Sequence, residues 1–144
     1  MALLSLVGWM AAACAPVISP IPPPPYRDRI AAPYDKTWAA LVRALAFDNV
    51  PLRVVAKDSG VIASDDIVSP IGVYADCGRK GETPLEGEAA AAYTVYVRAD
   101  GASTEIQINS KMYLVRQGVK GLECVSTTRW EPNLVDAVRR YVKE

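Results

Sequence analysis

The segment TEIQINSKMYL, residues 104–114, alternates apolar and polar side chains more regularly than any other part of the chain. One face of the alternation is apolar and consists of Ile106, Ile108, Met112 and Leu114. The other face is mostly polar and consists of Glu105, Gln107, Asn109, Lys111 and Tyr113. A period of two predicts a β-strand with one buried face and one wet face, as in an antiparallel sheet.

Turn residues on both sides of this segment predict further strands. Asp100-Gly101 precedes it, and Asp58-Ser59-Gly60 separates two runs rich in β-branched residues. The predicted additional strands cover residues 52–56, 61–67, 93–98 and 122–130. Because short turns join neighbouring strands, we expect an antiparallel sheet of about five strands, with residues 69–92 mostly irregular.

An amphipathic helix is predicted on each side of these strands. Asp35 is the expected cap of the first helix, which ends before Pro51. Its apolar stripe is Trp38, Leu41, Val42 and Leu45. Pro132 suits the first turn of the second helix, whose stripe is Leu134, Val135, Val138, Tyr141 and Val142. The predicted class is α+β, in the helix-grip-like order α-β-β-β-β-β-α, with both helices packed against the sheet.

The N-terminus has the features of an export signal. Residues 2–14, ALLSLVGWMAAAC, form an uncharged and mostly apolar run. A membrane-spanning helix needs roughly 20 residues, so this run matches the apolar region of a signal peptide better. We expect a signal peptide over residues 1–13. If Cys14 at the end of this run is not a lipidation site, the alternatives are an ordinary secretory signal with an incidental cysteine and an unprocessed apolar tail.

The end of this run, Ala11-Ala12-Ala13-Cys14, resembles the lipobox of bacterial lipoproteins. The resemblance implies that the Cys14 thiol receives a diacylglyceryl group and becomes the mature N-terminus. Acyl chains on that residue would attach the protein stably to a membrane. Ala15, in place of the aspartate that retains enterobacterial lipoproteins at the inner membrane, favours the outer membrane.

A proline-rich segment follows the cysteine. Between Cys14 and Tyr34 lie seven of the eleven prolines in the chain. Such a segment favours extended polyproline II, which predicts a stiff tether over residues 14–33 with a reach of up to ~50 to 60 Å. A docking ligand of the PxxP type is the alternative. A single folded domain is expected over residues 34–144.

Two cysteines remain, Cys77 and Cys124. An exported protein meets an oxidising compartment, in which paired thiols persist as disulfides. We expect these two to pair, closing a loop of ~48 residues and stabilising the fold by roughly 4 kcal/mol. Two buried free thiols are the alternative. No metal site is expected, because the domain offers neither histidine nor a third cysteine.

The composition argues against several classes of function. The chain has no histidine, which excludes Ser-His-Asp and Cys-His catalysis within it. Its 16 basic and 16 acidic residues balance, whereas nucleic-acid binders usually carry a basic excess. No motif for a cofactor is found, so none is expected. Trp38 and Trp130 are expected in the core, with a ligand groove between helix and sheet as the alternative.

The stretch YDKTWAALVRALAFDNVPLRVVAKDSGVIASD, residues 34–65, is similar to the opening of domains in many Gram-negative envelope lipoproteins. The shared pattern is an acidic residue, a tryptophan in a helix and a glycine before the second hairpin strand, here Asp35, Trp38 and Gly60. The helix-grip domains of the lipoprotein C component of the β-barrel assembly machinery are similar too. The resemblance implies a sheet that grips a helix, and it assigns no functional residue.

These observations favour a lipid-anchored accessory or interaction protein without catalytic activity. We expect it at the outer membrane, facing the periplasm, with a membrane contact through the lipid on Cys14 and a protein partner in the envelope. The alternative is a carrier that binds an apolar small molecule or lipid between sheet and helix. An enzyme is the least favoured class, because the usual catalytic groups are missing.

Overall fold

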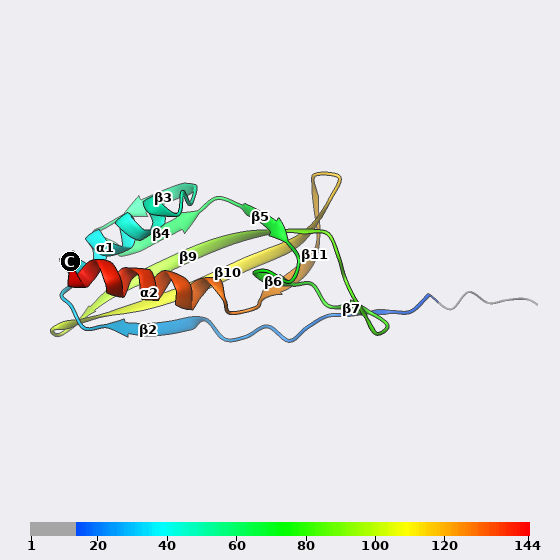
Figure 1. The fold of residues 1–144 in the computed structure, drawn as a ribbon, viewed down its shortest axis with the longest axis horizontal. Coiled ribbons are helices and arrows are strands. Elements are labelled where there is room, and N and C mark those ends of the chain that lie inside the picture. The colour runs from blue at the N-terminus through cyan, green and yellow to red at the C-terminus, as the bar shows by residue number, and fades with distance from the viewer. Residues whose placement is uncertain (1–13) are drawn as a thin grey trace, which may run out of the picture.

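A computed structural model describes residues 14–144, and the predicted signal peptide, residues 1–13, lies outside the described residues. The fold is α+β and is organised around one long hairpin (Figure 1). Its strands are β9 (Glu88–Asp100) and β10 (Ser103–Arg116). They pair antiparallel without a break from Ser103↔Asp100 to Val115↔Glu88. The predicted turn at Gly101 is therefore confirmed.

The hairpin is the centre of an eight-stranded antiparallel sheet, larger than the predicted five strands. The order is β3-β4-β9-β10-β11-β6, with β2 also beside β10 and β5 also beside β9. These outer strands are β2 (Tyr26–Ile30), β3 (Leu52–Ala56), β4 (Val61–Ser64), β5 (Ile67–Pro70), β6 (Ala75–Asp76) and β11 (Val119–Ser126). A second, small sheet consists of β1 (Val17–Ile18), β7 (Arg79–Lys80) and β8 (Thr83–Pro84).

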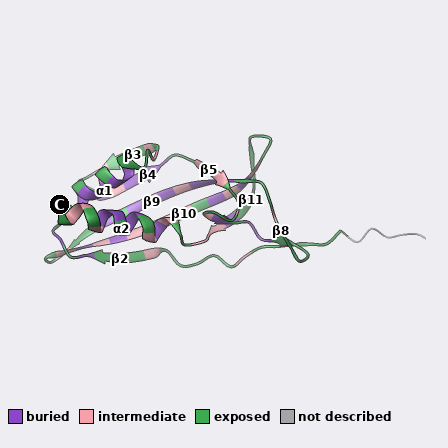
Figure 2. Cartoon of the chain, viewed as in Figure 1, coloured by how far each residue is buried: buried purple, intermediate pink, exposed green. Residues whose placement is uncertain are grey.

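The alternation in β10 has the predicted orientation. Ile106, Ile108, Met112 and Leu114 are all buried, whereas the residues between them are half-buried or exposed (Figure 2). Opposite Met112 and Leu114 lie Ala91 and Ala89 of β9. The prediction that residues 69–92 are mostly irregular was wrong here: residues 88–92 are strand, because pairing with β10 overrides the helical preference of alanine.

Two helices, α1 (Tyr34–Phe47) and α2 (Trp130–Lys143), cover one face of the sheet and pack against each other (Figure 1). Their predicted stripes point inward, and Leu41, Val135 and Val138 are fully buried. Asp35 is not the cap of α1, because the helix begins one residue earlier, after Pro33. The Asp35 carboxylate instead pairs with Lys57 at 2.8 Å.

The hairpin of β3 and β4 depends on Gly60. This residue has φ +68°, and a Cβ atom there would lie 2.1 Å from the carbonyl oxygen of Val97. Only glycine permits this approach, which allows the Val97 amide to donate to the Gly60 carbonyl at 2.8 Å. The predicted strand over residues 61–67 divides into β4 and β5, which pair with different parts of β9.

The structure corrects the predicted tether and domain boundary. Strand β2 lies within the supposed spacer, pairs with residues 104–108 of β10, and buries Ile30 at 1% exposure. Arg139 of α2 also pairs with Asp28 of β2 at 2.7 Å. The folded part therefore begins well before residue 34. The predicted last strand, residues 122–130, also has different bounds, because β11 ends at Ser126 and α2 begins at Trp130.

A pair of isoleucine variants tests whether β2 belongs to the fold. Ile30→Ala should lower the free energy of unfolding by about 2–4 kcal/mol, because it leaves a cavity in a packed core. Ile21→Ala is the matched control, since Ile21 is 90% exposed and its loss should change stability little. Chemical denaturation measures both. Equal stability of the two variants and the wild-type protein would contradict the assignment of β2 to the sheet.

Candidate functional site

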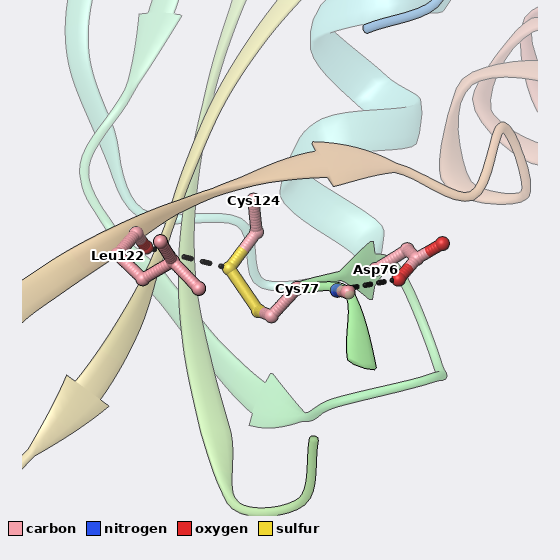
Figure 3. Close-up of a disulfide and its surroundings, with 5 residues drawn as sticks. Asp76, Cys77, Leu122 and Cys124 are labelled. Carbon is pink, nitrogen blue, oxygen red and sulfur yellow. Dashed lines mark hydrogen bonds between the residues drawn. A yellow bond between two sulfur atoms is a disulfide. The ribbon is translucent and has the colours of Figure 1, made fainter. Parts of the chain in front are cut away.

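The Cys77–Cys124 disulfide is present, which confirms the predicted pairing (Figure 3). Cys77 follows β6 and Cys124 lies on the inner face of β11, and both are buried. Asp76 fixes the next turn, because its carboxylate accepts a 2.8 Å hydrogen bond from the Gly78 amide. The bridge thus fastens the loop that carries β7 and β8 to the main sheet.

Cys14, the predicted lipidation site, is exposed and forms no disulfide. Three positions further on, Val17 pairs with Lys80, and Ile18 pairs with Arg79. Gly78 permits this contact, since a Cβ there would lie 2.1 Å from the Ile18 carbonyl oxygen. A spacer of ~50 to 60 Å is therefore wrong, because the chain attaches to the folded body almost immediately after Cys14.

The helices leave one face of the main sheet uncovered (Figure 1). The strand register fixes which side chains share it. Arg27, Gln107 and Tyr96 stand in one row across β2, β10 and β9. Together with Asn109 in the next row they border a shallow hollow of about 500 Å³. Planar polar groups around an exposed tyrosine ring suit the recognition of a polar surface.

One half of this open face is apolar. Val54 of β3, Val68 of β5 and Tyr96 of β9 are 39%, 54% and 43% exposed. Small residues of β4 and β9 lie between them, so few polar side chains interrupt the patch. Exposed apolar side chains that gather on one face mark sites of protein–protein contact.

The other end of the open face is charged. Arg29, Glu105 and Arg98 form the next row, and Glu105 and Arg98 also line the hollow. Glu105 pairs with Arg98 at 2.6 Å, and this hydrogen bond holds the pKa of its carboxyl below the usual value. Arg29 pairs with Asp100 at 2.6 Å. The Glu105 carboxylate thus stays ionised, and two ion pairs border this end of the open face.

The two predicted groove tryptophans do not line a common groove. Trp38 is buried and stacks on Tyr34 at 6.0 Å between ring centroids. Trp130 stacks on Tyr93 at 3.7 Å, at the start of α2. Core side chains such as Leu41 fill the space between helices and sheet. Trp38 is therefore a core residue, as expected. Trp130 is half-buried and borders a separate hollow of about 390 Å³ with Tyr74 and Leu134, so no single groove contains both rings.

A buried carboxylate in α2 was missed by the sequence analysis. Glu131 is 3% exposed, and one of its oxygens accepts a 2.6 Å hydrogen bond from the Ser126 hydroxyl. It lies in the first helical turn, where the helix dipole favours a negative charge. Burial, and then the charge of Glu131, raise the pKa of Tyr93. Tyr93 is therefore a neutral phenol. In the sequence, the only sign of the buried carboxylate of Glu131 is its position at the start of a helix.

Within residues 14–144, no cluster of acidic or cysteine side chains is arranged to bind a metal ion. In the same part of the chain no helix has the length and apolar content needed to cross a bilayer.

No protein-family model matches the chain. No curated protein matches it either. Among solved structures, it is similar to a DUF4468 family protein from Bacteroides ovatus, with 10% sequence identity and a TM-score of 0.39. The similarity covers 83% of this chain and 77% of that chain. A likeness this distant transfers no function, and the resemblance to envelope lipoproteins remains a prediction.

We expect loss of the Cys77–Cys124 disulfide to lower the stability of the fold substantially. Replacing both partners, Cys77→Ala with Cys124→Ala, should lower the free energy of unfolding by about 4 kcal/mol, because the unfolded chain loses a cross-link. Adding reductant to the wild-type protein should give a similar loss in denaturant titrations. Cys14→Ala is the control and should leave stability unchanged. A double variant as stable as wild type would contradict a stabilising role.

Proposed function

We propose that this protein is a lipid-anchored accessory protein of the bacterial outer membrane that faces the periplasm, binds another envelope protein and catalyses no reaction. The lipobox-like end of the apolar run supports acylation of Cys14. The Cys77–Cys124 disulfide supports an oxidising compartment. The two helices on one sheet face also support the finer assignment to a helix-grip-like fold.

The open sheet face is the observation that carries the proposed partner binding. Its apolar half, around Val68 and Tyr96, adjoins the ordered charges of Arg98 and Glu105. An apolar centre with a polar rim is the usual composition of a protein interface. Strand pairing fixes the backbone positions that carry these side chains, which limits the conformational entropy lost on binding.

A carrier is the second candidate, and a groove favours it. Strand β10 pairs with β2 up to Ile108 and with β11 from Met112, so residues 109–111 have no strand partner on that edge. The prolines before β2 lack the amide that would continue the ladder. They border a groove of about 550 Å³ that also contacts Tyr26, Val125 and Glu131. This groove is beside the sheet rather than under the helices.

Photo-crosslinking in cells tests the proposed interface. A photoreactive residue in place of Tyr96 should give an adduct with an envelope protein, because this position is in the apolar half of the open face. The same residue in place of Arg140, exposed on α2, is the matched control and should not. Mass spectrometry identifies the adduct. Equal labelling from both positions, or none from Tyr96, would contradict the proposed interface.

Two mass measurements separate the remaining alternatives. Intact-mass analysis should show a mature protein that begins at Cys14 and carries acyl chains. The Cys14→Ala variant should no longer be found in the membrane fraction. A soluble chain that retains Met1 and carries no acyl mass would overturn the anchor. Native mass spectrometry decides for the carrier when a small molecule copurifies and Val125→Trp, which fills the groove, removes it.

A further inference from the structure

We propose that the small sheet of β1, β7 and β8, here called the foot, contacts the phospholipid bilayer directly. Val17 and Ile18 of this foot, together with Ile21 shortly after β1, enter the membrane interface, and Arg79 and Lys80 bind lipid phosphate groups. The inference rests on the proposed acylation of Cys14 and goes beyond it. An anchor alone requires no contact between protein and bilayer.

Chain reach places the foot at the membrane. Val17 is three residues from Cys14, and an extended residue spans at most about 3.6 Å, so the two are within about 11 Å. The turn between β7 and β8 is also close, because a Cβ on Gly81 would lie 3.9 Å from that of Ala15. An acylated Cys14 therefore brings this turn to the level of the lipid headgroups.

The foot is fixed to the rest of the molecule at both of its ends. Backbone pairing joins β1 to β7, and the disulfide at Cys77 joins the segment before β7 to β11. After β7, the Leu85 amide donates to the Gly78 carbonyl at 3.0 Å. The foot lies at one end of the long axis, and the β9–β10 turn at Gly101 lies at the other (Figure 1). The protein would thus extend away from the bilayer.

The apolar side chains of the foot are poorly covered by protein. Val17, Ile18 and Ile21 are 47%, 60% and 90% exposed. Exposed apolar groups beside an acyl anchor gain a second membrane attachment by entering the interface. Their position within seven residues of Cys14 makes a bilayer the nearest apolar phase.

The charges of the foot suit phosphate. Arg79 and Lys80 are exposed, and neither forms an ion pair with another described residue. Guanidinium and ammonium groups bind phosphate oxygens with charge-assisted hydrogen bonds. Glu82 in the turn and Glu86 after β8 offset this positive charge within the same segment. Contact with individual phosphates, rather than long-range attraction to an anionic surface, is therefore the expected mode.

Tryptophan quenching by brominated lipid tests the foot. The acylated mature Ile18→Trp protein, which begins at Cys14, is reconstituted into phosphatidylcholine–phosphatidylglycerol vesicles, with or without bromine on the acyl chains. The fluorescence contributed by the new tryptophan should fall about twofold on brominated vesicles, as expected for interfacial insertion. Ala102→Trp, at the opposite end of the molecule, is the matched control and should not be quenched. The parent protein corrects for Trp38 and Trp130.

Charge reversal supplies the second arm. Arg79→Glu with Lys80→Glu should reduce the quenching at position 18, whereas Lys36→Glu, exposed on α1, should not. An acylated, vesicle-bound protein whose position 18 is quenched no more than position 102 overturns the foot while the anchor stands. Quenching that charge reversal leaves unchanged overturns the assignment of phosphate binding. A protein without acyl mass that stays off the vesicles overturns the anchor itself.

Discussion

Backbone pairing along β10 is the constraint on which the rest of the structure depends. One edge of this strand pairs with β9 over its whole length. Two strands share the other edge: β2 pairs with residues 104–108, and β11 pairs with the part that begins at Met112. The N-terminal segment and the disulfide-bearing strand therefore lie side by side along one strand, although they are about 90 residues apart in sequence.

This sharing determines where the functional surfaces lie. Because β2 pairs with β10, the proline segment before β2 runs along the molecule toward the small sheet. Cys14 is therefore close in sequence to β1 of that sheet, and the disulfide at Cys77 attaches the same sheet to β11. The helices occupy one face, and the other presents an apolar patch with a charged rim. The proposed anchor at one end and the proposed binding face along the side fit a protein that presents its sheet to a partner above the membrane.

The sequence predicted those helices and strands that a pattern of apolar residues within the element itself identifies. The alternation in β10 and the helical stripes around Leu41 and Val138 are such signals, and the pairing of the two domain cysteines followed from their number and compartment. Other features depend on partners far away in sequence. Strand β2 has five residues beside prolines, and the alanines of residues 88–92 favour helix, so both need β10 to become strand. The burial of Glu131 likewise depends on Ser126 and the packing of α2.

Hydrogen exchange of the backbone amides in Tyr26–Ile30, measured on the membrane-bound protein, tests the central claim most directly. The account predicts that the amides paired with β10 exchange as slowly as those of the β9–β10 hairpin, because they open only when the sheet opens. Exchange at the rate of an unstructured chain would show that this segment is a free tether. Cys14 would then no longer be held beside β7.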